Sequence, residues 1–318
     1  MKNDWLRLLG FLEGKGYRAK IVPIGRIEDI QEMIETRRAR GELDETLDRE
    51  QLREFTFEPP PGSSALASLI IVAVPVPMHQ VTFIWEGREL AAVLPPTYVR
   101  YRATIKRVQD EIAAFAGPFG HETAPAALPL KSLAVGCGLG TYGKNNLCYV
   151  PGMGSFLQLV GAYSTVREPA DEWPGPRMLP RCEKCEACRR SCPTGAIRED
   201  RFLIAAERCL TFHNERHQDF PEWIDPSWHN ALVGCMKCQS ICPENTPFRD
   251  WIEPGVEFNE CETRLFLSGS GTGMGDLPAE TEAKIKRLGL TESWTLMCRN
   301  LAALVRARTA EANEQGRR

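Results

Sequence analysis

The sequence predicts an α+β protein, and three observations support this fold class. The length of 318 residues allows about two domains. Apolar residues at helical spacing and at strand spacing alternate along the first half of the chain. The second half carries two blocks of closely spaced cysteines, which are typical of a small domain built around metal. We therefore expect an α/β domain over residues 1–175, a cysteine-rich domain over 176–250 and a mostly helical extension over 251–318.

The first quarter of the chain predicts two helices and two strands. Apolar residues recur at helical spacing from Trp5 to Leu12, and a glycine at position 14 then breaks the pattern. Residues 18–24 are typical of a short strand. Ile27, Ile30 and Ile34 predict a second helix. The continuous β-branched run over 69–76 indicates a buried strand.

A hairpin and a long helix are expected next. Residues 81–85 and 89–94 flank the turn Glu86-Gly87-Arg88. Apolar residues at helical spacing over 105–115 predict an amphipathic helix with basic residues on its early turns.

The remaining elements are shorter. Residues 147–150 and 156–163 predict strands, and 264–267 a further short strand. Two short helices are expected over 283–288 and 295–306.

Composition excludes several classes of protein. The net charge of −3 gives no polybasic signature of a dedicated nucleic-acid binder. No apolar run is long enough for a membrane span, and the first residues lack the apolar core of a secretory signal. Twelve cysteines without an export signal indicate metal ligation in a reducing compartment, so we expect a cytoplasmic protein without membrane contact.

The first cysteine block has the spacing C-x2-C-x2-C-x3-C-P and comprises Cys182, Cys185, Cys188, Cys192 and Pro193. In bacterial ferredoxins with this spacing, three cysteines bind one 4Fe–4S cluster and the fourth binds the other cluster. Thiolates at every third residue of a tight loop can reach three corners of a cube. The proline stops the segment from continuing as a helix.

The second block complements the first and comprises Cys209, Cys235, Cys238 and Cys242. We expect Cys209, Cys235 and Cys238 to join Cys192 on one cluster. Cys242 would cross back to the first three cysteines, so that eight thiolates complete two clusters. Zinc sites and disulfides are the alternatives, but zinc favours paired C-x2-C units around one tetrahedron. The other four cysteines are expected to be buried small hydrophobic residues: Cys137, Cys148, Cys261 and Cys298.

A glycine-dense loop with the sequence GCGLGTYGKN occupies residues 136–145. It contains G-x4-G-K, as phosphate-binding loops do, but Asn145 replaces the Ser or Thr that would hold magnesium. Nucleotide hydrolysis is therefore not expected. We expect these glycines to let the backbone approach a flat, bulky ligand.

Together, these motifs resemble those of the epoxyqueuosine reductases. The resemblance covers residues 130–247 well and 69–115 more weakly, and the order of the motifs is specific, whereas each glycine motif alone is not. The residues that carry it are Gly138-Leu139-Gly140-x-x-Gly143-Lys144-Asn145, Gly154-Ser155-Phe156, the eight cysteines, Cys238-Gln239 and Cys242-Pro243-x-Asn245.

The resemblance implies an architecture and a second cofactor. Epoxyqueuosine reductases and the related reductive dehalogenases combine two 4Fe–4S clusters with a cobalamin. The cobalamin lies in an α/β domain similar to the nitroreductase fold, beside a ferredoxin-like domain. Carried onto this sequence, the residues near the cobalamin would be Gly140, Lys144, Cys148, Leu159, Leu210 and His217, the last of them two helical turns after Leu210.

One position departs from the family pattern. The resemblance implies a proton-donating Asp before the glycine loop, and this chain has Ala124 at that position. His121 and Glu122 are the candidate replacements, with Tyr142 as a further candidate acid. The alternative is that His121 and Glu122 lie on a surface turn without a catalytic role.

The resemblance implies an iron–sulfur oxidoreductase. An external donor of the ferredoxin or flavodoxin type would reduce the clusters, which would reduce a cobalamin that acts on an organic substrate. One alternative is a two-cluster electron-transfer protein that serves a partner enzyme, which leaves about 170 N-terminal residues without a purpose. The other is a tRNA epoxyqueuosine reductase proper, with tRNA as its substrate. The missing Asp and the acidic net charge weigh against this second alternative.

Overall fold

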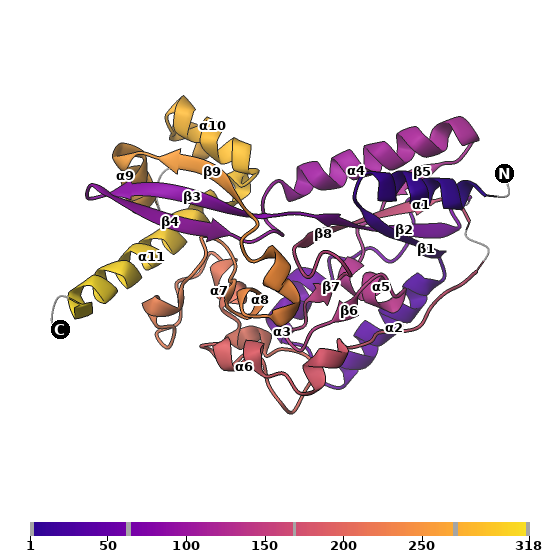
Figure 1. The fold of residues 1–318 in the computed structure, drawn as a ribbon, viewed down its shortest axis with the longest axis horizontal. Coiled ribbons are helices and arrows are strands. Elements are labelled where there is room, and N and C mark those ends of the chain that lie inside the picture. Colours follow the sequence, from indigo (N-terminus) through magenta and orange to yellow (C-terminus); the bar gives the residue numbers. More distant parts are fainter. Residues whose placement is uncertain (1–2, 62–64, 168–169, 270–272, 316–318) are drawn as a thin grey trace. The chain divides into compact units, whose positions relative to one another are not determined.

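The computed structural model describes residues 3–61, 65–167, 170–269 and 273–315. Contacts divide the chain into two compact units, each assembled from several segments (Figure 1). The first unit comprises Met1–Pro75, Arg102–Glu186 and Glu199–Leu203, and the second comprises Val76–Tyr101, Ala187–Arg198 and Ile204–Arg318. Each unit combines helices with a sheet of its own, so the predicted α+β class is confirmed.

The first unit is built on a four-stranded antiparallel sheet with the order β1-β2-β8-β5. Its strands are β1 (Arg18–Pro23), β2 (Ser68–Pro75), β8 (Leu157–Ser164) and β5 (Thr123–Pro125). The two central strands, β2 and β8, are almost entirely buried, which explains the unbroken apolar run of β2. The strands predicted over 18–24, 69–76 and 156–163 are therefore confirmed.

Helices cover both faces of this sheet (Figure 1). On one face, Phe11 of α1 stacks on Phe115 of α4, with the ring centroids 4.7 Å apart. On the other face, the three isoleucines of α2 are buried in a core that also contains residues of β2 and α5. The three isoleucines therefore lie on one buried face of α2, as their helical spacing predicts. The four helices are α1 (Asp4–Gly14), α2 (Arg26–Ala39), α4 (Tyr101–Ala116) and α5 (Leu130–Gly136).

The second unit has a three-stranded sheet with the order β4-β3-β9. Its strands are β3 (Met78–Trp85), β4 (Arg88–Leu94) and β9 (Ile252–Phe258). The predicted hairpin is confirmed, and its two turn residues, Glu86 and Gly87, have φ values of 51° and 70°, as a type I′ turn requires. The helices α9 (Glu260–Ser268), α10 (Ala279–Leu288) and α11 (Trp294–Gln315) follow. Phe83, Phe258 and Phe266 meet in the core, with ring centroids 4.8 to 5.1 Å apart.

Two predictions for the C-terminal part are wrong. The strand expected over 264–267 is part of the helix α9, because Asn259 caps this helix in a capping box with Glu262. Strand β9 was not predicted, since Pro254 and Gly255 resemble loop residues. Gly255 is required here, because a Cβ atom at this position would lie 2.6 Å from the carbonyl oxygen of Gln80 in β3.

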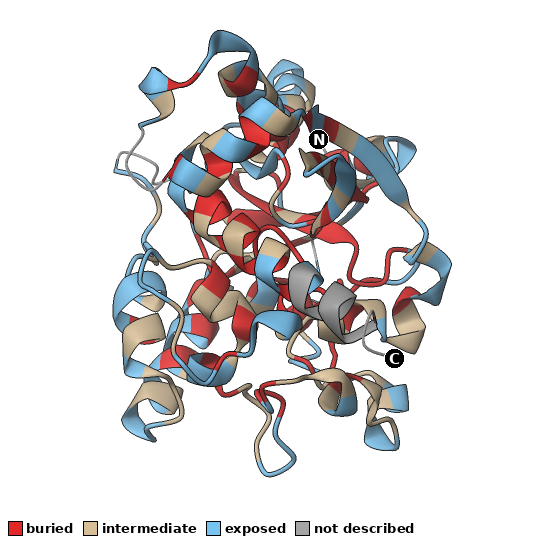
Figure 2. Ribbon diagram, turned by 90° about the vertical axis from the view of Figure 1, so that its left-hand side faces the viewer, coloured by how far each residue is buried: buried red, intermediate tan, exposed pale blue. Residues whose placement is uncertain are grey.

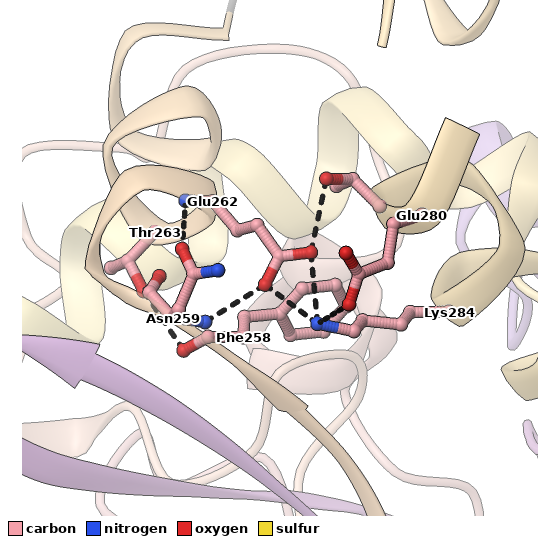
Figure 3. Close-up of polar contacts among 7 residues, drawn as sticks. Phe258, Asn259, Glu262, Thr263, Glu280 and Lys284 are labelled. Atoms are coloured by element: carbon pink, nitrogen blue, oxygen red, sulfur yellow. Dashed lines mark hydrogen bonds and ion pairs between the residues drawn. The ribbon is translucent and has the colours of Figure 1, made fainter. Parts of the chain in front are cut away.

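A buried carboxylate joins α9 to α10 (Figure 3). Glu262 is 5% exposed and accepts hydrogen bonds from the backbone N–H of Asn259 at 2.8 Å and from Thr281 Oγ1 at 3.0 Å. Lys284 Nζ lies 2.7 Å from Glu262 Oε2 and completes an ion pair. An N-cap of this kind contributes about 1 kcal/mol. The network holds both helices at the end of β9.

Burial follows the strands and the inward faces of the helices (Figure 2). Two separate groups of buried apolar side chains, one in each unit, form the cores. Among the residues that the structure describes, none of the helices has the length and the apolar character needed to cross a bilayer.

Candidate metal centre

All twelve cysteines lie in the described part of the chain, and none of them forms a disulfide. Cys182 and Cys185 belong to the first unit, and the other six predicted ligands belong to the second. Within the described ranges, no three His, Cys, Asp or Glu side chains are arranged to hold a single metal ion. A 4Fe–4S cluster needs a different arrangement, because each cysteine binds a separate iron. The short helices α6 (Ala187–Ser191), α7 (Leu210–Asn214) and α8 (Lys237–Ser240) carry or adjoin these cysteines.

Four cysteines of the second unit, Cys192, Cys209, Cys235 and Cys238, form what we call the cysteine quartet. Burial raises the pKa of Cys209 to about 11 and also raises the pKa values of Cys235 and Cys238. Negative charges on the other three members, and on Cys188, raise the pKa of Cys238 further, so Cys238 lies within electrostatic reach of these four cysteines. Burial therefore makes the bare thiolates of Cys209, Cys235 and Cys238 unfavourable, and iron, which binds cysteines as thiolates, would stabilise them. The donor set therefore fits an iron–sulfur cluster.

Hydrogen-bond donors surround the sulfur atoms of the quartet. Asn230 Nδ2 lies 3.2 Å from the Sγ atom of Cys235, and its Oδ1 accepts the backbone N–H of Met236 at 2.7 Å. Cys209 is the N-cap of α7, and the backbone N–H groups of Thr211 and Phe212 lower the pKa of its thiol. Donors at a helix N-terminus favour negative charge on sulfur.

The glycine loop contacts the start of the first cysteine block. The backbone N–H of Lys144 donates to Cys182 Sγ at 3.4 Å. Its side chain reaches the same segment, where Nζ donates to the carbonyl oxygen of Cys185 at 3.0 Å and pairs with Glu186. Lys144 therefore holds the loop that carries two predicted cluster ligands.

The glycines of this loop make room for the protein's own side chains. A Cβ atom on Gly140 would lie 2.6 Å from Cys148 Sγ, and one on Gly143 would lie 2.5 Å from Tyr149 Cε2. Both neighbours come from β7 (Cys148–Tyr149), which pairs with β6 (Thr141–Tyr142). The expectation that these glycines approach a flat ligand is therefore not supported, because β7 fills the space beside them. Packing within the first unit thus accounts for Gly140 and Gly143, and cobalamin binding near this loop stays a prediction.

Replacing Gly140 with alanine is expected to destabilise the first unit by about 1–3 kcal/mol, the usual cost of overpacking a core. The added methyl group would have to displace Cys148 Sγ or the carbonyl oxygen of Tyr149, 2.8 Å away. The free energy of unfolding, from urea titration, measures the effect.

Gly10→Ala is the matched control. Gly10 lies inside α1 and has no atom within 4 Å of the added methyl group. This variant is expected to gain about 0.5–1 kcal/mol from helix propensity. Equal stability of the two variants would contradict the tight packing around Gly140.

The other predicted cofactor residues lie in different surroundings. Cys148 is buried, and burial raises its pKa to about 12, so it is an unreactive thiol. Leu159 packs against the core of the first unit, and Leu210 is buried in the second. His217 is exposed, and its Nδ1 lies 3.1 Å from Thr295 Oγ1. The helical spacing assumed for His217 is absent, because α7 ends at Asn214.

The two candidate acids lie beside the edge strand β5. His121 contacts Thr165 Oγ1 at 3.2 Å through Nδ1 and Asp4 Oδ2 at 3.3 Å through Nε2. Glu122 is exposed, and its backbone N–H donates to Thr165 Oγ1 at 3.0 Å. Ala124 lies in β5 and lines a hollow of about 430 Å³ against α4. The contacts of His121 are structural, so its catalytic role stays a prediction.

Sequence reasoning missed the donor to the quartet and misassigned one cysteine. Asn230 has no motif around it, and only its position five residues before Cys235 could have drawn attention to it. Of the four cysteines expected to be buried, Cys137, Cys148 and Cys298 are, but Cys261 is exposed on α9.

The cysteine segment matches a family model. Residues 181–245 match the 4Fe-4S double cluster binding domain, which contains all eight predicted ligands. A protein with this domain is expected to hold two clusters.

Curated and solved relatives agree with the predicted resemblance. The epoxyqueuosine reductase of Burkholderia pseudomallei is 32% identical over 182 residues, which cover 51% of this chain and 44% of that protein. The chain thus spans less than half of this relative's length. The solved epoxyqueuosine reductase from Streptococcus thermophilus has a TM-score of 0.64 at 16% identity, covering 95% of this chain and 81% of that one.

A further solved epoxyqueuosine reductase was determined with an epoxyqueuosine-modified tRNA-Tyr stem loop. It has a TM-score of 0.58 at 17% identity and covers 76% of this chain and 65% of that one. At these identities the solved structures establish a shared fold. The chain is therefore similar to epoxyqueuosine reductases in sequence over about half of its length and shares their fold.

Proposed function

We propose that this epoxyqueuosine reductase-like chain is an iron–sulfur oxidoreductase that passes single electrons through two 4Fe–4S clusters to a reducible organic substrate. The observation that carries the proposal is the set of eight free cysteines, the quartet among them, inside a segment that matches the double-cluster binding domain. Clusters of this type supply one-electron transfer over a wide range of potentials.

We assign the quartet to one cluster, and Cys182, Cys185, Cys188 and Cys242 to the other. All four cysteines of the quartet belong to the second unit, which supports their assignment to one cluster. The other four are assigned by spacing, which is that of two-cluster ferredoxins. With this assignment the second unit would contain most of the ferredoxin-like domain, and the first unit would be the nitroreductase-like α/β cofactor domain that the resemblance implies.

Two residues of the chain donate hydrogen bonds to sulfur atoms of the proposed cluster ligands. The Asn230 amide donates toward Cys235, and the Lys144 backbone N–H donates to Cys182. Donors to sulfur stabilise the added negative charge of a reduced cluster and raise its potential. Asn230 is held by a hydrogen bond with Met236, and Lys144 is held by its contact with Glu186. Both donors are therefore in position before the cluster is reduced.

We derive no step through cobalamin. The glycine loop expected to approach it is filled by Cys148 and Tyr149. Cobalamin binding stays a prediction of the resemblance, and anaerobic titration with cobalamin followed by absorption tests it.

Substrate and electron donor are parts of the proposal. The solved relative with a modified tRNA stem loop supports a tRNA substrate, whereas the net charge of −3 does not favour nucleic acid. A donor of the ferredoxin or flavodoxin type would supply the electrons. The cytoplasmic location stays a prediction.

Iron and acid-labile sulfide analysis of anaerobically purified protein tests the clusters. We expect about eight of each per chain, the content of two 4Fe–4S clusters. Stoichiometric zinc with little sulfide would overturn the proposal.

The filled glycine loop favours a second candidate, a two-cluster electron carrier. Reduction of epoxyqueuosine-containing tRNA by the reduced protein alone would support the enzyme. Cluster reduction followed by electron delivery only to an added partner enzyme would support the carrier.

A further inference from the structure

A half-buried phenol–carboxyl pair lies in the second unit. The Tyr98 hydroxyl donates a hydrogen bond to the carboxylate of Glu215, a residue 117 positions further along the chain. Burial raises the pKa of both groups. A buried carboxyl group is costly to keep, and perturbed buried groups of this kind often mark functional sites.

Glu215 is connected to the quartet through one short helix. Cys209 is the N-cap of α7 and Glu215 is its C-cap, so the two residues mark opposite ends of the same helix. Six residues at a rise of about 1.5 Å per residue separate them by about 9 Å along the axis. The carboxylate is therefore held at a fixed distance from a cluster ligand.

Tyr98 reaches the quartet from another direction. Gly234, which has a φ of 71°, directly precedes Cys235, and a Cβ atom there would lie 2.6 Å from the Tyr98 hydroxyl oxygen. Thiolates at Cys209 and Cys235 both raise the pKa of Tyr98. The hydroxyl group thus lies against the segment that carries one ligand and within the field of a second.

Two buried asparagines keep these segments together. Asn214, beside Glu215, donates to the carbonyl oxygen of Gly234 at 2.6 Å. Asn300 of α11 donates to the carbonyl oxygens of Asn214 and Leu232, both at 2.9 Å. The distance between the pair and the quartet is therefore fixed by the fold.

We propose that the Tyr98–Glu215 pair lowers the reduction potential of the cluster held by the quartet, by holding a half-buried negative carboxylate near it. This inference rests on the proposed function. Reduction adds an electron, and an anion nearby opposes the added charge, the more so where solvent is partly excluded. Tyr98 donates to the carboxylate and so favours its charged form.

The experiment is an anaerobic redox titration of the protein with both clusters, followed by electron paramagnetic resonance. Glu215→Gln removes the charge and keeps the size of the side chain. We expect one midpoint potential to rise by about 59 mV, a tenfold change in a one-electron equilibrium. The other potential should shift less. Glu222→Gln, which neutralises an exposed carboxylate of the same unit, is the control and should change the equilibrium less than twofold.

Tyr98→Phe removes the hydrogen-bond donor and provides an independent second variant. Its shift should have the same sign, and the double variant should match Glu215→Gln alone, because the pair acts as one unit. Iron and sulfide are counted in every variant. Unchanged potentials with full iron content would overturn this inference alone, whereas wild-type protein without clusters would overturn the proposed function.

Discussion

Replacing Cys238 with alanine is expected to halve the iron content, from about eight to about four atoms per chain, because one of two 4Fe–4S clusters loses a ligand. Cys238 is the member of the quartet whose pKa is raised by burial and by negative charge on the other three members and on Cys188. Electron transfer to substrate should fall more than tenfold. Iron analysis and electron paramagnetic resonance of the reduced protein measure the loss.

Cys261→Ala is the matched control for this substitution. Cys261 is exposed on α9 and lies outside the family-model match. The Cys261→Ala variant should leave both the iron content and the electron paramagnetic resonance spectrum unchanged. If Cys238→Ala kept eight irons, the quartet would not be a cluster site.

Acidification is expected to destabilise the second unit through His229. This imidazole is 7% exposed, and its buried Nδ1 has no hydrogen-bond partner among the described residues. Burial, with smaller contributions from Arg299 and Arg306, lowers the His229 pKa to about 4. Between pH 6.5 and pH 4 the unfolded chain binds a proton at this residue and the folded chain does not. Stability is therefore fully present above pH 6.5 and lost as the pH falls toward 4, by about 2 kcal/mol from pH 7 to pH 5 and about 3 kcal/mol in all.

Urea unfolding at pH 7 and pH 5 measures this loss. His229→Gln should remove about 2 kcal/mol of the difference between the two pH values. His217→Gln replaces an exposed histidine of the same unit and should retain the full pH dependence. Equal pH dependence in both variants would show that another group is responsible.

The sequence predicted those elements whose pattern alone determines their structure. The three isoleucines of α2 and the β-branched run of β2 are buried as their spacing requires. Strand β9 could not be predicted in this way, because it forms only when β3, more than 160 residues earlier, offers an edge for its Pro–Gly segment. Helix α9 depends on a cap at Asn259 that overrides the apolar run after it.

The residues of the candidate site also fall into two groups, those that local sequence spacing predicts and those that depend on tertiary contacts. All eight proposed ligands were found from the cysteine spacing, because cysteines that bind one 4Fe–4S cluster lie only a few residues apart in the sequence. The donor Asn230 and the Tyr98–Glu215 pair depend on tertiary contacts between distant segments, and no local interval marks them. The glycine loop was misjudged for a related reason: glycines show that something approaches closely, but not whether it is a ligand or β7.

The order of segments in the second unit has a consequence for biosynthesis. Its sheet takes two strands from residues before 95 and the third from Ile252–Phe258, while α11 closes the core. A ribosome synthesises these segments at different times, and a domain folds as a unit only after its last segment has emerged. The core that contains Leu232 and Val233, just before Cys235, is therefore incomplete until the C-terminal helix has left the exit tunnel. Metal insertion can precede closure of the core, and a nascent chain stalled before residue 252 should still exchange iron with a scavenging chelator.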